Sequence, residues 1–163
     1  MVEKPGKKQK GKSGNATVVA VGDVVISRRQ PGEAFAKTVG ELKSGTFACC
    51  NFEVPLSNKG TPQYGKFETL HAAPEMIEGF VRGGFTVVSL ANNHSMDYGA
   101  EALLDTLDLI DSRGILHAGA GRNGEEARRP AFFSPGIRVF ASRSASSIRW
   151  TRGTLARAAI WPA

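Results

Sequence analysis

The chain has 163 residues, of which 41% are hydrophobic and 22% charged, proportions typical of a globular protein with one hydrophobic core. The formal net charge of +6 would suit an anionic partner, but the basic residues lie at the two ends. Residues 1–16 hold five Lys and one Glu, residues 127–163 hold seven Arg and no acid, and acids outnumber bases between them. Nucleic-acid-binding proteins usually interleave basic and aromatic residues on one folded face. We therefore expect no nucleic-acid partner.

Nothing in the sequence indicates secretion or membrane insertion. Cys49 and Cys50 are adjacent, and neighbours in an extended strand point to opposite faces, so they do not readily form a disulfide. No apolar stretch has the length of a signal peptide or a transmembrane helix. By sequence we expect a cytoplasmic location and no membrane segment.

The first elements in chain order are a basic tail, a strand and a helix. Residues 1–15 are rich in Lys and Gly and lack apolar periodicity, so we predict a disordered tail. Residues 16–25 (ATVVAVGDVV) form an apolar, β-branched run that predicts a strand ending at Gly22 and Asp23. A helix is predicted over 31–42, where Pro31 stands at the start and Ser44 and Gly45 follow the end.

The middle of the chain continues the alternation of strands and helices. Strands are predicted at 46–54 and 85–94, with a helix at 74–84 between them that a glycine pair ends. The turn-rich segment 57–69 is predicted to be a loop that could cover a site. The clearest helix is at 99–113, because apolar residues recur along one face of it.

The last part of the chain is predicted to change character after Phe140. A fourth strand at 115–121 precedes a loop at 121–130 with at most one helical turn, and 131–140 reads as a hairpin turning at Pro135 and Gly136. Residues 141–163 show no period of 2 or 3.6, so we expect an unstructured basic tail. Alternating strands and helices indicate an α/β domain over residues 16–140.

Polar residues follow three of the predicted strands at the same relative place. They are Asp23 after the first strand, Asn51 and Glu53 after the second, and Asn92, Asn93 and His94 after the third. Each residue alone could be a turn cap or a solvated edge residue. Together they indicate a site, because the carboxyl ends of adjacent parallel strands meet at one edge of a sheet. Carboxylate, amide and imidazole groups are ligands that divalent ions accept.

These motifs resemble those of the CapA family, named for capsule and poly-γ-glutamate synthesis. The resemblance rests on VVAVGDVVISR, on ACCNFEVPLS, and above all on residues 85–130, where SLANNHSMDYG is followed by a helix and GAGRN. It extends from Thr17 to Phe140. The chain is also similar, more distantly, to calcineurin-like metallophosphatases. This resemblance implies a layered α-β-β-α sandwich, represented here mainly by its N-terminal half.

The resemblance also implies roles for the strand-end residues. Asp23, Asn51, Glu53 and Asn93 would be metal ligands for divalent ions such as Mn, Fe or Zn. His94 would be catalytic, protonating a leaving oxygen or steadying a transition-state charge. Asp97, three residues later, would orient the His94 imidazole. An alternative role for Asp97 is the N-cap of the helix that follows.

Two departures from the family pattern bear on activity. Val25 stands where the phosphoesterase motif has a His, and the family takes its remaining metal ligands from His residues in the second half of its domain. His71, in the loop, and His117, in the fourth strand, are expected to be structural or exposed. We expect a site without a full ligand set, and a sheet with one uncovered apolar face that favours aggregation or homo-oligomers.

Three functions follow from these observations. The first is a component of capsule or poly-γ-glutamate synthesis, with a metallophosphatase-type fold and incomplete catalysis. The second is an active metal-dependent phosphoesterase, and the third, which rests only on the basic ends, is a nucleic-acid-binding protein. Other capsule-synthesis components are the expected partners, and family members often work at the cell envelope. The acid-free sequence after Phe140 is typical of translation in a shifted frame, with a natural basic tail as the alternative.

Overall fold

The computed structural model describes residues 16–133 and two further strands at 137–142 and 147–152. It contains a parallel sheet in the order β1-β2-β3-β4 and an antiparallel sheet in the order β5-β6-β7. The strands are β1 Val18–Val24, β2 Phe47–Phe52, β3 Phe85–Ser89, β4 Leu116–Ala118, β5 Ala131–Phe133, β6 Ile137–Ser142 and β7 Ser147–Arg152. The α/β class expected from the sequence is confirmed.

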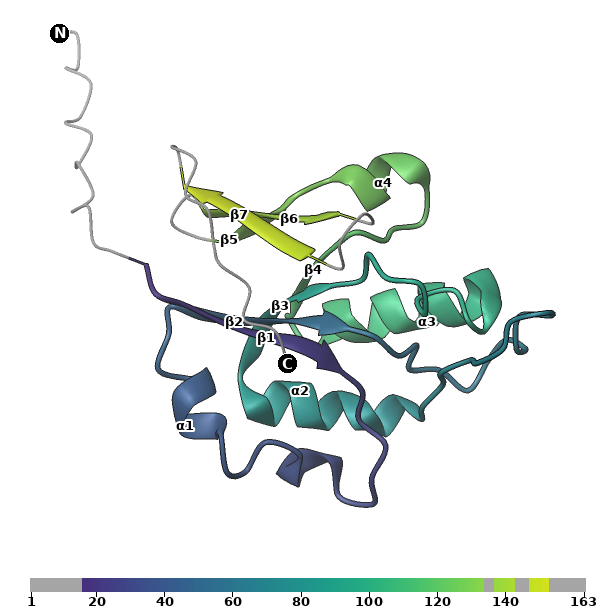
Figure 1. Cartoon of the computed structure of the whole chain (residues 1–163), viewed down its shortest axis with the longest axis horizontal. Coiled ribbons are helices and arrows are strands. Elements are labelled where there is room, and N and C mark those ends of the chain that lie inside the picture. Colours follow the sequence, from purple (N-terminus) through teal and green to yellow (C-terminus); the bar gives the residue numbers. More distant parts are fainter. Residues whose placement is uncertain (1–15, 134–136, 143–146, 153–163) are drawn as a thin grey trace, which may run out of the picture.

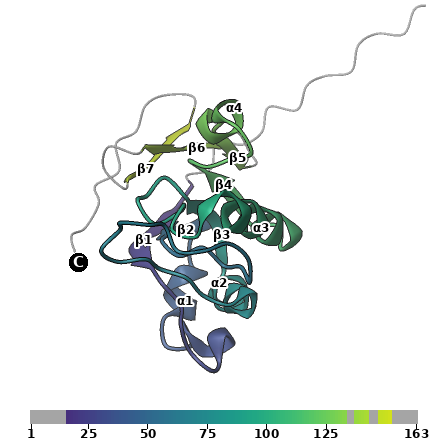
Figure 2. The same cartoon turned by 90° about the vertical axis from the view of Figure 1, so that its right-hand side faces the viewer.

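The helices are the 3₁₀ helices η1 Pro31–Glu33 and η2 Pro74–Met76 and the α-helices α1 Val39–Leu42, α2 Ile77–Gly83, α3 Gly99–Ser112 and α4 Gly124–Arg128. Those that connect parallel strands lie on one face of the parallel sheet, whereas α4, between β4 and β5, lies beside the antiparallel sheet on the other side (Figure 1). The sheet of β5, β6 and β7 lies on the opposite side of the parallel sheet from α1 and α2 (Figures 1 and 2). The domain thus has a helical layer and two sheets.

The segment 31–42 differs from the continuous helix predicted for it. It forms η1, a run of turns and the four-residue helix α1. Neither helix has a side-chain cap at its N-terminus. Gly32, Thr38 and Gly40 all have low helix propensity, so backbone entropy opposes a single long helix here. The other predicted strands and helices are found within a few residues of their expected positions.

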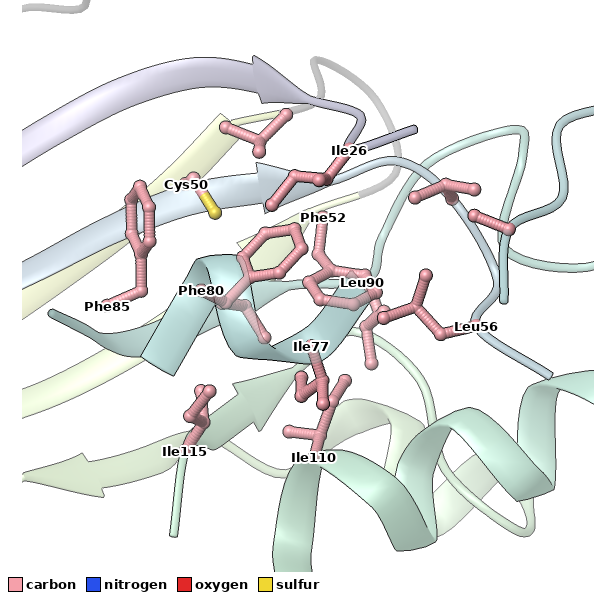
Figure 3. Packing of buried hydrophobic residues seen from close by; sticks show 14 of the residues in the cluster. Ile26, Cys50, Phe52, Leu56, Ile77, Phe80, Phe85, Leu90, Ile110 and Ile115 are labelled. Carbon is pink, nitrogen blue, oxygen red and sulfur yellow. The ribbon is translucent and has the colours of Figure 1, made fainter. Parts of the chain in front are cut away.

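The main hydrophobic core lies between the parallel sheet and the helices. Phe52 of β2 and Phe80 of α2 are fully buried, with ring centroids 4.3 Å apart, and Leu107 and Ile110 of α3 join the same cluster. Figure 3 shows Phe52, Phe80, Ile77 and Ile110 meeting in this cluster. All six residues of β2 are buried, as expected for a central strand of a parallel sheet covered on both faces.

The second face of the parallel sheet is covered, contrary to the expectation of an uncovered apolar face. Phe47, Cys49 and Val87 point to this side and are at most 1% exposed, and Ala118 and Ala131 are buried with them. The covering layer is the antiparallel sheet, whose hairpin of β5 and β6 was predicted from the sequence. Its turn at 134–136 lies outside the described residues. Within the parallel sheet, the edge strand β1 is more exposed, because its residues Ala20, Val21 and Gly22 face solvent.

The prediction of an unstructured segment over 141–163 is wrong for residues 141–142, which end β6, and for residues 147–152. The latter residues form β7, which pairs antiparallel with β6 from Ile137↔Arg152 to Ser142↔Ser147. Pairing with β6 can impose an extended conformation on a partner strand whose own sequence lacks a period of 2. Residues 143–146 and 153–163 lie outside the described part. Within that part, no helix combines the length and apolar character that a membrane span requires.

Candidate functional site

The parallel pairing of β1, β2 and β3 places the predicted site residues at one edge of the sheet. Asp23 of β1 lies opposite Asn51 of β2, and Asn51 lies opposite Ser89 of β3. The Glu53 N–H donates to the carbonyl of Val24 at 3.3 Å, which continues this pairing past the end of β2. Asn92, Asn93 and His94 follow β3 at the same edge. The topology thus accounts for the shared position of all three polar clusters.

A chain of hydrogen bonds links the three strand ends. Asn51 Nδ2 donates to Asp23 Oδ1 at 2.7 Å, and Asn92 Nδ2 donates to Asn51 Oδ1 at 3.0 Å. Asn92 also donates to the Phe52 carbonyl at 2.9 Å, and its Oδ1 accepts from the His94 N–H at 3.0 Å. Asn51 is 2% exposed, so a buried amide holds the carboxylate of the exposed Asp23. Asn92, which was predicted at this edge but not among the metal ligands, joins the strands.

Glu53 is half-buried and lies in the electrostatic field of two other site residues. Burial, and then the negative charge of Asp23, raise the pKa of Glu53 above its ordinary value, whereas His94 acts in the opposite direction. A carboxylate with a second carboxylate nearby is destabilised in its charged form unless a cation lies between them. The pair Asp23 and Glu53 therefore favours a positive charge at this edge of the sheet.

His94 and Asp97 form a hydrogen-bonded pair. His94 Nδ1 lies 2.7 Å from Asp97 Oδ2, and the Asp97 side chain is fully buried. Burial by itself would raise the pKa of Asp97, but hydrogen bonds from Lys66, from the Leu70 N–H and from His94 lower it overall. Asp97 is therefore an ionised acceptor, so Nδ1 carries the proton that faces it, and this hydrogen bond leaves Nε2 available to other partners.

The alternative role of Asp97 as a helix cap does not match the structure. The N-cap position of α3 is Tyr98, and no side chain caps it. The Asp97 carboxylate instead accepts hydrogen bonds from the Leu70 N–H at 2.5 Å and from the ammonium of Lys66. Its contacts are those of a residue that orients the His94 imidazole.

Lys66 is a site residue that the sequence interpretation missed. Its ammonium donates to Asp97 Oδ1 and to the Asn93 carbonyl, the latter at 2.7 Å, and lies 3.4 Å from His94 Nδ1. Lys66 belongs to the segment 57–69, which was predicted only as a loop that could cover a site. The position of Lys66 in the sequence does not predict its place in the site, because only the fold of this loop brings it close to His94.

The described residues fit part of the coordination shell of a divalent ion. Asp23 and Glu53 offer two carboxylates at adjacent strand ends, and Asn93, which follows β3, is exposed. Within the described part of the chain, no group of three or more His, Cys, Asp or Glu is arranged to hold a metal ion. Asn51 already uses both its amide atoms in hydrogen bonds to Asp23 and Asn92. Asp23 and Glu53 are thus the residues best suited to hold a divalent cation.

The other histidines and the cysteines stand apart from these strand-end residues. His71 is exposed and stacks on Tyr98 with ring centroids 4.1 Å apart, and His117 in β4 lies 3.3 Å from Asp111 of α3. Burial raises the pKa of the Cys49 thiol to about 11, and it raises the pKa of the Cys50 thiol well above its ordinary value. Both thiols are therefore protonated at neutral pH, and neither is a metal ligand or nucleophile in this state.

Comparison with known proteins identifies a family whose sequence pattern matches most of this chain. The family described as "Bacterial capsule synthesis protein PGA_cap" matches residues 17–158. The chain belongs to this family. The match continues past Phe140, where the resemblance was expected to end. It includes Asp23, Glu53 and His94, so the strand-end residues lie within the family region.

Individual relatives agree with this assignment. The chain is 36% identical over 121 residues to the uncharacterized protein y4sH of Sinorhizobium fredii, covering 68% of this chain and 26% of that protein. It is 29% identical over 135 residues to the capsule biosynthesis protein CapA of Bacillus anthracis, covering 76% of this chain and 33% of the relative. The PGA biosynthesis protein CapA of Bacillus subtilis is 29% identical over 118 residues, covering 67% of this chain and 31% of that protein. The chain thus spans about a quarter to a third of the length of these relatives.

Proposed function

We propose that this protein is a component of capsule or poly-γ-glutamate synthesis whose strand-end residues form part of a metallophosphatase-type site. The single observation that carries the proposal is the convergence of Asp23, Glu53 and the His94–Asp97 pair at the carboxyl edge of one parallel sheet. Capsule synthesis comes from the family and from the names of the two Bacillus relatives.

Each group would have a distinct part in such a site. Asp23 and Glu53 would hold a divalent ion such as Mn, Fe or Zn, whose chemistry is to polarise a phosphoryl oxygen and to lower the pKa of a bound water. His94 Nε2 would exchange a proton with an oxygen of the substrate, because Nδ1 is occupied by Asp97. Asn51 would hold Asp23 in place through its amide.

We further propose that the chain by itself is catalytically incomplete. Two carboxylates hold a divalent ion less firmly than a full shell of four to six protein ligands, and they do not fix two ions at once. An active metal-dependent phosphoesterase is the second candidate, favoured by the His94–Asp97 geometry.

Calorimetric titration of the purified full chain with Mn²⁺ tests the metal part of this proposal. We expect weak binding, with Kd roughly 10⁻⁴–10⁻³ M, the range of weak oxygen-ligand sites. Asp23→Asn and Glu53→Gln should each weaken it by tenfold or more, because each removes a negative charge from the pair. Asp108→Asn is the matched control, since Asp108 is an exposed acid on α3 that pairs with Arg122. Binding that Asp108→Asn weakens as much as Asp23→Asn would contradict this assignment.

Hydrolysis of a generic phosphodiester, with and without Mn²⁺, separates the two candidate functions. The incomplete site predicts no rate above the metal-only background. Robust Mn²⁺-dependent hydrolysis that His94→Ala abolishes would establish the active phosphoesterase instead.

A further inference from the structure

The segment 57–70, here called the strap, crosses the turn that carries the site residues 93–98. Beside β2 the strap begins with Ser57, whose hydroxyl donates to Asp105 of α3 at 2.6 Å. Further along, the Gln63 N–H donates to the Asp97 carbonyl at 2.7 Å, and the Leu70 N–H donates to the Asp97 carboxylate. Figure 1 shows the long connection between β2 and α2 extending beyond the carboxyl ends of β1 and β2. The strap is therefore attached to the turn at several points.

The close approach of the strap to this turn is built into its backbone. Gly60 has a φ of +82°, and a Cβ at this position would lie 2.0 Å from the Tyr98 carbonyl oxygen. Only glycine combines this left-handed conformation with such a short approach. His71, one residue after the strap, stacks on Tyr98 from the same turn.

Lys66 is the strap residue whose side chain enters the site. Three atoms of the turn surround its ammonium: Asp97 Oδ1, the Asn93 carbonyl oxygen and His94 Nδ1. Asp97 Oδ2 accepts from the Leu70 N–H and faces His94 Nδ1, so among the described residues Lys66 supplies the donor to the other carboxylate oxygen. The Lys66 side chain is 22% exposed, whereas Asp97 is fully buried. Lys66 thus determines which way the buried carboxylate is turned.

We propose that Lys66 is a positioning residue: by holding Asp97 Oδ1 and the Asn93 carbonyl, it turns Asp97 Oδ2 to His94 Nδ1 and fixes the imidazole with Nε2 free. The geometry carries this inference, because one ammonium donates both to the carboxylate that faces His94 Nδ1 and to the backbone carbonyl of the residue before His94. That the fixed His94 imidazole serves proton transfer rests on the proposed function. The positioning itself is a property of the chain alone.

Imidazole ¹⁵N spectra of the full chain test this inference, with the His94 signals assigned by comparison with His94→Gln. Spectra are recorded over a series of pH values and compared where the His94 signals no longer change as the pH rises, so that the neutral tautomers are what is compared. We expect the wild-type His94 signals to show a protonated Nδ1 and an unprotonated Nε2. In Lys66→Met both signals should move toward the average of the two tautomers. Lys66→Arg should restore the wild-type pattern, because a guanidinium also donates to a carboxylate and a carbonyl.

Lys59→Met is the matched control, because Lys59 lies in the same strap and pairs with Asp105, away from His94. It should leave the His94 signals unchanged. Unchanged His94 signals in a folded Lys66→Met variant, or equal changes in Lys59→Met, would overturn the inference. If Lys66→Met does not fold, a folded Lys66→Arg variant decides: retained Nδ1 protonation supports the inference and mixed tautomers overturn it. The spectra do not depend on hydrolysis, so failure of the proposed function and failure of the positioning role are separate results.

Discussion

Two lysines of the strap, Lys59 and Lys66, form the same kind of ion pair in different surroundings. The pair of Lys59 is called the outer end below, and the pair of Lys66 the inner end. At the outer end, Lys59 Nζ lies 2.7 Å from Asp105 Oδ1, and the two side chains are 54% and 28% exposed. At the inner end, Lys66 pairs with the fully buried Asp97. The outer pair is shielded by water, whereas the inner pair lies beside a proposed catalytic imidazole. Two Lys–Asp pairs can thus contribute differently to stability, and the burial of the carboxylate decides how much each contributes.

The neighbours of each pair differ as well. Asp105 lies on the surface of α3 and takes a second hydrogen bond from Ser57. Asp97 takes its other hydrogen bonds from a backbone N–H and from His94, so its carboxylate joins the strap, the turn and the imidazole. Loss of Asp97 would therefore disturb three parts of the molecule, and loss of Asp105 would disturb one.

The largest expected effect is from Asp97→Ala at the inner end. Removing one partner of a buried ion pair leaves the other without compensation, which typically costs about 3–5 kcal/mol. Urea unfolding followed by circular dichroism would measure this loss. Asp97→Asn is the control for shape, since it keeps the size of the side chain and loses the charge. A loss below about 1 kcal/mol for Asp97→Ala would mean that the inner pair behaves like a surface pair.

A medium loss of stability is expected from Thr106→Val, which removes the buried hydrogen bond between α3 and Leu56, the residue before the strap. Thr106 is 1% exposed, accepts from the Leu56 N–H at 3.0 Å and donates to the Ala102 carbonyl at 2.7 Å. Valine leaves the buried Leu56 N–H without its acceptor, which costs about 1–3 kcal/mol. Thr106→Ser keeps the hydroxyl and should retain more stability in the same unfolding measurement. Equal losses in the two variants would assign the effect to packing instead.

The smallest effect is expected from Asp105→Asn at the outer end, and it should depend on pH. Hydrogen bonds from Lys59 and then Ser57 lower the pKa of Asp105 from its ordinary value of 3.8. A carboxyl whose pKa is lower in the folded state stabilises the protein above the unfolded value, and this contribution disappears as the pH falls through the folded value. Asp105→Asn should therefore lower the stability slightly at pH 7 and leave it unchanged well below pH 3.8. Urea unfolding at both pH values checks this, and an equal loss at low pH would contradict it.

Much of the site could be predicted from the sequence because its residues follow strands. Asp23, Glu53 and His94 each lie within three residues of the end of an apolar run, and parallel strands share a carboxyl edge, so their meeting needs no knowledge of loops. Lys66 and Asn92 could not be given their places in this way. Lys66 depends on the path of a turn-rich segment, and Asn92 is one of two adjacent asparagines that the sequence does not distinguish. Only Asn92 donates to both Asn51 and Phe52 in the fold.

The sequence by itself determined the α/β class, the order of strands and helices up to the hairpin at 131–140, and the edge of the sheet where the polar residues gather. These properties follow from local patterns, namely apolar runs, turn residues and the period of α3. Only the tertiary structure decided that β7 forms, that the second face of the sheet is covered, and that Lys66 reaches Asp97 and His94. The physical reason is that strand pairing, face covering and loop closure depend on contacts between separate elements of the fold. Such contacts override weak local preferences without leaving a periodic pattern in the sequence.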